Sequence, residues 1–420
     1  MDYLKPNGKR RVVVTGAGML SALGRSWPEA SARLREQKNL IKRMDGWNFV
    51  GMNTRLACPC EIELPRFPRK KVRGMGRVGL LSLVATDDAL RMAGLVRADG
   101  SIAPVIQNGR TGIAYGCCMG SMDALSAMCG IFERGDTTKI DSQTYIKCMP
   151  QTCAANLSIF YSVKGRVIIT DTACTSGSQA IGYAYEAIED GRADVMIAGG
   201  ADELTAADSA IFDVMGAAST MNDTPSKTPK AWDKDRDGLV IGEGGGTLIL
   251  EDLRHATERG ARVFAEVAGF ATNMDGTHIT TPNSETQAVA LQMALEDAAL
   301  SADAIGYVNA HGTATHAGDI SESQAVYKVF KRAVPVSTTK SYIGHTLGAS
   351  GAIEAWLSVC MMSEGLFHPN LNLGEVDPEC APLDYIKGGM RRIDTDYVMS
   401  NNFAFGGVNT SLIFKKWRGQ

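Results

Sequence analysis

The stretch VIITDTACTSGSQAIGYAYEAIEDG, residues 167–191, decides the fold of this chain. Its first four residues form an apolar, β-branched run, which is typical of a strand. Small and apolar side chains then recur with the spacing of one helix face and stop at Gly191: Ala180, Ile181, Ala184, Ala187 and Ile188. The pattern predicts a strand that runs into a helix at Cys174.

Cys174 stands at this predicted junction of strand and helix. A thiol on the first turn of a helix lies at the positive end of the helix dipole, beside unpaired N–H groups, and both effects lower its pKa. The sequence therefore predicts a nucleophilic thiolate at Cys174. The alternative is a buried structural cysteine, a common environment for a free thiol.

The composition is that of a globular protein, and its net charge does not point to a class of binding partner. The 420 residues are 45% hydrophobic and 21% charged, which suffices for a large core and for two or three domains or one duplicated unit. A net charge of −3 gives no support to nucleic-acid or membrane binding, and no apolar run approaches the ~18 to 20 residues that span a bilayer. Ten cysteines without a CxxC pair, and no secretory signal at the start, lead us to expect a cytoplasmic protein.

Strand and helix patterns alternate along the chain, which predicts an α/β fold. Residues 334–365 repeat the order of the central stretch: a β-rich run, a turn containing Gly, and a helix of small residues. Two copies of one unit indicate an internal duplication. If the two halves pack back to back, the turns that carry Cys174 and His345 would lie close together.

Two further turns carry residues suited to catalysis. The run YVNAHGTAT, residues 307–315, places His311 just past a strand, and KSYIGHTLGASG, residues 340–351, carries Lys340 and His345. Open α/β folds bind ligands beyond the ends of their strands. These positions therefore favour a functional role over that of a structural core histidine.

A thiol and two histidines suggest acyl-transfer chemistry. A thiolate accepts an acyl group as a thioester. A neutral imidazole presents one N–H, and two such donors stabilise the negative charge that develops on a carbonyl oxygen by ~3 to 4 kcal/mol each. Lys340 can balance charge or donate a hydrogen bond in the same pocket; the alternative is an ordinary surface lysine.

The densest positive charge lies in LPRFPRKKVRGMGR, residues 64–77. Such a run is either a solvated face or a docking surface for an acidic partner, to which basic side chains add association rate and orientation. Its basic residues are Arg66, Arg69, Lys70, Lys71, Arg73 and Arg77.

Four motifs resemble, in order and spacing, those of the elongating β-ketoacyl-acyl carrier protein synthases of the KAS I and KAS II type: DTACTSG around Cys174, NAHGTAT around His311, KSYIGH from Lys340 to His345, and NNFAFGG around Phe403. The resemblance extends over nearly the whole chain. It implies the thiolase fold, with duplicated α/β halves in a five-layered α-β-α-β-α arrangement, and a homodimer. It also implies a decarboxylating Claisen condensation with a Cys-His-His triad.

The resemblance implies a role for each matching residue. Cys174 takes the acyl chain from the phosphopantetheine arm of an acyl carrier protein, and no metal or free cofactor is expected. His311 and His345 bind the thioester carbonyl of malonyl carrier protein and favour its decarboxylation. Lys340 and Glu354 match the charged pair behind the histidines.

Other positions match the substrate channel and the partner surface. The backbone N–H groups of Cys174 and Phe403 match the oxyanion hole, and Phe403 matches the aromatic gate in loop 401–409. Four residues match substrate contacts: Thr313, Thr315, Phe405, and Met119 in the turn that limits acyl-pocket depth. Four basic residues fall where the family docks its carrier protein: Arg69, Lys70, Lys71 and Arg73.

The resemblance also divides the chain into two halves. We expect residues 1–260 to carry Cys174 and the insertions for dimerisation and capping. Residues 261–420 would carry the two histidines, Lys340 and the gate loop. Three positions depart from the family pattern: Ala404 replaces a usual Gly, His316 replaces a usual Pro, and TTPN at 280–283 is altered. Because Ala tolerates positive φ poorly, Ala404 predicts a stiffer gate loop.

Several functional alternatives remain at this point. The chain can serve ordinary fatty acids, or it can be the ketosynthase of a specialised polyketide or polyene pathway, working with a partner subunit. A catalytically inactive chain-length subunit would lack the nucleophile, so Cys174 disfavours it, and a cysteine hydrolase would leave the second histidine without a role. His345 disfavours the starting synthases, with Cys-His-Asn, and the thiolases, with a second Cys.

Overall fold

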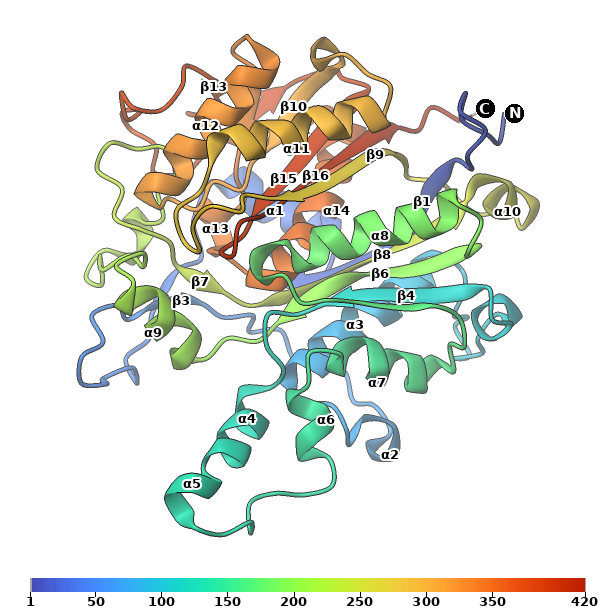
Figure 1. The fold of residues 1–420 in the computed structure, drawn as a ribbon, viewed down its shortest axis with the longest axis horizontal. Helices are drawn as coiled ribbons and strands as arrows, with labels where there is room; N and C mark the ends of the chain where they lie inside the picture. The colour runs from blue at the N-terminus through green and yellow to red at the C-terminus, as the bar shows by residue number, and fades with distance from the viewer. Residues whose placement is uncertain (1, 420) are drawn as a thin grey trace.

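The computed structural model describes residues 2–419 and is built on one large mixed sheet (Figure 1). Among the described residues this sheet has eleven strands. In spatial order they are β13 (Asp384–Tyr385), β11 (Pro335–Ser337), β10 (Ile305–Asn309), β15 (Tyr397–Phe403), β16 (Val408–Lys416), β9 (Ala265–Met274), β1 (Val12–Ser21), β8 (Gly244–Asp252), β6 (Val195–Asp202), β4 (Thr111–Gly116) and β5 (Val167–Thr170).

The strand order repeats, which confirms the internal duplication. In the first half, β5, β4 and β6 are parallel neighbours, and β8 and β1 follow in antiparallel pairing. In the second half, β11, β10 and β15 are parallel, and β16 and β9 follow in antiparallel pairing. The two halves meet where β1 pairs with β9 over three residues, Val12 to Val14.

The strands of the two halves form two layers, and helices form the other three. The helices α8 (Ser176–Glu189) and α14 (Ser350–Glu364) contact strands of both halves and lie between them. The helices α3 (Arg77–Met92) and α7 (Thr152–Tyr161) cover the outer face of the first half. The helices α11 (Ser284–Asp297) and α12 (His316–Phe330) cover the second. The result is the predicted five-layered α-β-α-β-α arrangement.

The central helices approach each other closely because glycines face the contact. A Cβ at Gly351 of α14 would lie 2.4 Å from the backbone nitrogen of Ser178 on α8, and a Cβ at Gly177 would lie 2.6 Å from the Gly348 carbonyl oxygen. No side chain fits at either distance. These contacts bring the N-termini of α8 and α14 close together.

Smaller elements surround these layers. The short helices are α1 (Trp27–Glu36), α2 (Arg69–Val72), α4 (Met122–Cys129), α5 (Ile131–Arg134), α6 (Thr144–Cys148), α9 (Ala206–Val214), α10 (Leu253–Glu258) and α13 (Lys340–Ile343), and the 3₁₀ helices are η1 (Pro104–Gln107), η2 (Ala173–Thr175), η3 (Pro225–Lys227), η4 (Ala302–Ala304) and η5 (Leu347–Ala349). The remaining strands are β2 (Lys42–Arg43), β3 (Leu56–Cys58), β7 (Ile241–Gly242), β12 (Leu366–Phe367) and β14 (Arg391–Arg392). Figure 1 shows α4, α5 and α6 extending away from the body.

The central stretch itself differs from the expectation in two ways. Strand β5 ends at Thr170, and the turn η2 separates it from α8, so Cys174 precedes the α-helix. β5 is also the edge strand of the sheet, and the side chains of Val167 and Ile169 are 47% and 37% exposed. Within residues 2–419, no helix is both long and apolar enough to span a bilayer.

Candidate active site

Cys174 is held in a tight turn at the start of α8. Its neighbour Ala173 has a φ of 50°, in the left-handed region that residues with a Cβ seldom occupy. Ser176 stabilises this turn, because its hydroxyl accepts from the Thr172 N–H at 3.0 Å and donates to the Ala173 carbonyl at 2.7 Å. The strained turn fixes the position of the thiol at the end of the central helix layer.

His311 lies in the turn that follows β10. The Glu322 carboxylate on α12 accepts the backbone N–H groups of His311 and Gly312, each at 2.7 Å. Burial raises the pKa of Glu322 to about 8. Sequence reasoning missed Glu322, because a carboxylate inside a helical pattern carries no local sign that it clamps a turn eleven residues earlier.

His345 lies between α13 and η5. Its Nδ1 accepts the Leu347 backbone N–H at 3.2 Å and lies 3.0 Å from the Ser350 hydroxyl. A ring nitrogen that accepts from a backbone amide carries no proton, so the proton of a neutral His345 is on Nε2. This Nε2 is buried and has no hydrogen-bond partner among the described residues.

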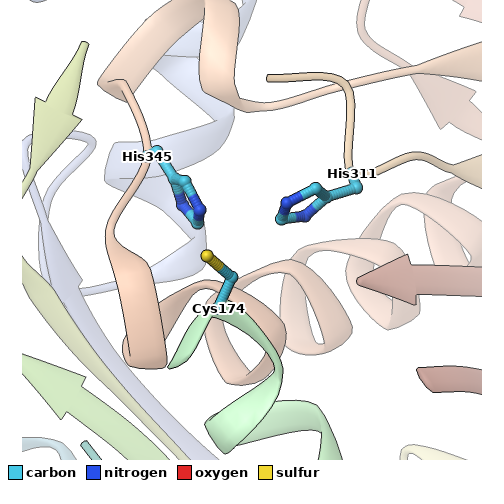
Figure 2. Close-up of side chains that lie close together, drawn as sticks. All are labelled: Cys174, His311 and His345. Atoms are coloured by element: carbon cyan, nitrogen blue, oxygen red, sulfur yellow. The ribbon is translucent and has the colours of Figure 1, made fainter. Parts of the chain in front are cut away.

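The fold brings Cys174, His311 and His345 together (Figure 2), and the duplication predicted this proximity for Cys174 and His345. The Cys174 Sγ and one nitrogen of each ring all lie within 4.8 Å of one another. The two ring centroids are 5.0 Å apart, and the rings are nearly perpendicular, at 86°. All three side chains are buried. A reacting carbonyl carbon near the sulfur would therefore have two imidazoles beside it.

Burial determines the protonation of the two histidines. Loss of hydration, followed by the positive charge of Lys340, lowers the pKa of both rings well below the usual value; for His311 the neighbouring His345 acts in the same direction. Both imidazoles are therefore neutral at pH 7, and each presents a single N–H. This is the state that a hydrogen-bond donor to a carbonyl oxygen requires.

Burial also governs Cys174, and here the sequence prediction is wrong. Desolvation raises the pKa of the Cys174 thiol to about 12, and this outweighs Lys340 and the backbone N–H groups of Cys174 and Phe405, which lower it. The helix end is enclosed by the histidine turns and the gate loop, so a thiolate there would lose its hydration. The thiol of the resting protein is therefore protonated at pH 7.

A pH dependence of alkylation follows from this pKa. We expect the rate of Cys174 carboxamidomethylation by iodoacetamide in the unliganded protein to rise about tenfold per pH unit, with no plateau below pH 9, because the thiolate fraction still increases there. Peptide mass spectrometry of Cys174 between pH 6 and 9 measures it. A plateau near pH 7 would contradict a thiol whose pKa is raised by burial.

Lys340 and Glu354 form a buried ion pair behind the histidines. The Lys340 Nζ lies 2.5 Å from Glu354 Oε1, and both side chains are 2% exposed. The other oxygen, Oε2, accepts from the Asn402 side-chain amide at 2.8 Å. The predicted pair is thus present in the structure, and its positive charge acts on Cys174 and both rings.

The gate loop offers a different donor from the one predicted. Phe403 is the last residue of β15, is paired with Asn409, and packs its ring edge-on against His311 with centroids 6.2 Å apart. In the turn that follows, the N–H groups of Ala404, Gly406 and Gly407 all donate to backbone carbonyls. The Phe405 N–H has no backbone acceptor within residues 2–419 and faces the thiol. The structure therefore favours Phe405 over Phe403 as the second oxyanion-hole donor.

The positive φ that Ala tolerates poorly does not occur at Ala404. Positive φ values in this turn occur at Gly406 (88°) and Gly407 (77°), and Ala404 is not among the described residues with positive φ. Backbone bonds instead tie the turn to the neighbouring loop, from Gly406 N–H to the Ile279 carbonyl and from Asp275 N–H to the Gly407 carbonyl. The glycines, and not position 404, carry the unusual conformation.

One cavity of about 550 Å³ opens onto the triad. Thr313 and Thr315 line it, and their hydroxyl groups lie 2.9 Å apart; Phe403 and Phe405 also line it. Met119 does not, because the loop after β4 directs its side chain outward, where it is 36% exposed. Met119 therefore does not contact this cavity, and the structure gives no support to its predicted role in limiting the depth of the acyl pocket.

Among residues 2–419, two clusters have the donor types of a metal site. One is the triad itself, and the other comprises His316, Asp377 and Glu379. In the second cluster Asp377 already accepts from the Arg236 guanidinium at 2.6 Å, and His316 and Glu379 are exposed.

The basic cluster lies on α2 and its flanks. Arg69, Lys70, Lys71 and Arg73 are exposed. Arg77, in contrast, forms an ion pair with the buried Glu243 at 2.5 Å. Arg66 is exposed as well, so five of the six basic side chains are available to a partner, while Arg77 is paired with Glu243.

Sequence comparison finds relatives along nearly the whole chain. Family models described as "Beta-ketoacyl synthase, N-terminal domain" and "Beta-ketoacyl synthase, C-terminal domain" match residues 9–256 and 264–374. The chain is 36% identical, over 97% of its length and 99% of the relative's, to 3-oxoacyl-[acyl-carrier-protein] synthase 2 of Vibrio harveyi.

Two solved structures show the same architecture. A crystal structure of a beta-ketoacyl synthase from Burkholderia phymatum STM815 is 51% identical with a TM-score of 0.94, and the match covers 97% of this chain and all of that one. The structure of the ishigamide ketosynthase/chain length factor is 29% identical with a TM-score of 0.85, and the match covers 97% of this chain and 100% of that one. The chain therefore belongs to the beta-ketoacyl synthase family and has its thiolase fold.

Proposed function

We propose that this protein is a β-ketoacyl-acyl carrier protein synthase that extends an acyl chain by two carbons in fatty acid biosynthesis. The observation that carries the proposal is the cluster of one thiol and two neutral imidazoles within 4.8 Å, at the end of a 550 Å³ cavity. A thiol accepts the acyl group, and two N–H donors are the groups that an enolate oxygen needs.

The reaction proceeds in two steps. First the Cys174 sulfur attacks the acyl thioester on a carrier protein, the N–H groups of Cys174 and Phe405 stabilise the tetrahedral oxyanion, and the pantetheine sulfur departs and takes up the proton that the Cys174 thiol loses. Then His311 and His345 donate to the thioester carbonyl of malonyl carrier protein. The malonyl C–C bond breaks, CO₂ leaves, and the resulting carbanion attacks the acyl carbon and displaces the Cys174 thiolate.

Intact-protein mass spectrometry tests this assignment. The protein is incubated with acyl carrier proteins of graded chain length and unsaturation, and then with malonyl carrier protein. We expect Cys174 to gain the mass of the acyl group and the carrier to return with a chain two carbons longer. Loading followed by release of free acid, without an extended product, would indicate a hydrolase instead.

We also propose a homodimer whose subunits meet at β5. The motivation is an edge strand with exposed apolar side chains at Val167 and Ile169, because an uncovered edge of this kind invites pairing with another chain. The exposed Phe132 (91%) and Tyr145 (67%) on the projecting segment α4–α6 offer further apolar contacts. We also propose that each subunit consists of two halves, residues 1–260 and 261–420.

A ketosynthase of a specialised pathway is the second candidate. The likeness to the ishigamide ketosynthase/chain length factor favours it. In that case a second, related chain would occupy β5 in place of an identical one. Size-exclusion chromatography with light scattering, together with an activity assay of the chain alone, separates the two: an active homodimer supports the first candidate, and an inactive monomer the second.

The exposed basic cluster on α2 is proposed to dock the acidic carrier protein. Replacing Arg69 and Lys70 together by Glu is expected to raise the apparent KM for the carrier protein several-fold at low salt, with kcat little changed, because like charges then slow association. Steady-state kinetics at two salt concentrations measure it. Replacement of the exposed Lys139 by Glu, a single charge reversal away from α2, is the control, and an unchanged KM at low salt would exclude docking at this cluster.

A further inference from the structure

Asn402 is a buried polar residue that the mechanism above does not use. It lies on β15, next to Phe403, and its side chain is fully buried. Its amide nitrogen lies 2.8 Å from Glu354 Oε2 and 3.5 Å from His311 Nδ1. It therefore connects the Lys340–Glu354 ion pair to one ring of the triad.

The orientation of this amide follows from its surroundings. A carboxylate oxygen only accepts hydrogen bonds, so the amide group that faces Glu354 must be the NH₂. The amide oxygen points the other way, toward Gly351 of α14, where an added Cβ would lie 2.8 Å from it, and it has no hydrogen-bond partner within residues 2–419. A flipped amide would place its oxygen against the carboxylate and would lose the hydrogen bond to Glu354.

The NH₂ group has two hydrogens, and two acceptors face it. One hydrogen serves Glu354, and the other is directed at His311 Nδ1. The 3.5 Å contact is long, as is common for catalytic hydrogen bonds before substrate binds. A ring nitrogen that accepts from an amide carries no proton, so the proton of a neutral His311 is on Nε2.

The two histidines thus reach the same tautomer by different means. For His345 a backbone amide, that of Leu347, occupies Nδ1. For His311 the corresponding donor is a side chain. We propose that Asn402 is a positioning residue that fixes the Nε2–H tautomer of His311 and so makes this ring a donor to the malonyl thioester carbonyl. The catalytic part of the inference rests on the proposed function.

The tautomer is measured without substrate. Protein labelled with ¹⁵N-histidine is studied by two-bond ¹H–¹⁵N correlation at pH 7.5, and the His311 signals are identified by their loss in the H311N variant. We expect a protonated Nε2 and an unprotonated Nδ1 in the wild type. In the Asn402→Leu variant, which keeps the side-chain volume but has no donor, we expect protonated Nδ1 to appear.

Kinetics give the second arm. In Asn402→Leu we expect acylation of Cys174 at the wild-type rate, because this step uses the backbone N–H groups of Cys174 and Phe405. Condensation is expected to fall about tenfold, the effect of losing one well-placed hydrogen bond. Asn156→Leu is the matched control, since it removes a buried side-chain amide from α7 outside the cavity; both steps should keep their rates.

The outcomes are distinct. A His311 tautomer that is the same in Asn402→Leu and wild type overturns the proposal, whatever happens to the rate. Protonated Nδ1 together with slower condensation supports it. A wild-type protein that neither loads nor condenses would refute the proposed function, while the tautomer comparison would still test the role of Asn402. If Asn402→Leu does not fold, Asn402→Ser, which leaves at most one donor for two acceptors, is examined in the same way.

Discussion

Replacement of Cys174 by Ala is expected to abolish acyl loading and condensation while the fold persists. The change removes one sulfur atom from the turn η2 and leaves the bonds of Ser176 that hold this turn. Within residues 2–419, no other cysteine forms a cluster with both rings, so the residual rate should lie several orders of magnitude below that of the wild type. Intact-protein mass spectrometry after incubation with an acyl carrier protein measures it.

Cys153→Ala is the matched control for this experiment. Cys153 is buried on α7, away from the cavity, so its variant should load like the wild type. Thermal unfolding should give similar Tm values for both variants. Acylation of the Cys174→Ala protein at the wild-type rate would contradict the assignment of the nucleophile.

Replacement of His345 by Ala is expected to leave loading intact and to stop condensation. The buried, unpartnered Nε2–H of His345 is one of two donors to the enolate oxygen, and loss of such a donor costs about 3 to 4 kcal/mol, or about 10² to 10³ in rate. In the acylation step the negative charge develops on a different oxygen, that of the acyl thioester, and the backbone N–H groups of Cys174 and Phe405 stabilise it. Mass spectrometry of Cys174 and product analysis with malonyl carrier protein separate the two steps.

His368→Ala provides the comparison. His368 is also a buried imidazole, whose pKa burial lowers to about 4, but it lies against Tyr342 and does not line the cavity. We expect this variant to condense normally if it folds. Equal loss of both steps in His345→Ala would mean that the ring supports the structure of the site and does not act on the malonyl group.

Local patterns in the sequence sufficed for much of the architecture. The β-rich runs and small-residue helical patterns of residues 167–191 and 334–365 indicated two equivalent units, and a strand followed by a turn and a helix forms in both. These features depend on interactions between residues close in the chain, and local propensity and hydrophobic spacing report them directly. The motifs around Cys174, His311 and His345 pointed to the chemistry for the same reason.

The structure differs from the predictions made from the sequence in quantities that depend on the environment of a residue. The sequence placed Cys174 at a helix start and so predicted a lowered pKa, but only the packed structure shows how completely the thiol is desolvated. Likewise, the choice between Phe403 and Phe405 depends on where the β15 ladder ends and which N–H groups the next turn already uses. Met119 lies in a turn whose direction no local pattern encodes.

The sequence by itself thus determined the duplicated α/β fold and predicted Cys174, His311 and His345 as the reactive cluster. Tertiary structure alone decided the charge of these groups and which donors face the two rings, because these depend on lost hydration and on segments distant in the chain. The Glu322 clamp on His311 comes from the next helix, and the Asn402 amide comes from a strand 91 residues further along the chain. Free energies of this kind arise only once the segments pack together, since water supplies the same hydrogen bonds in the unfolded chain.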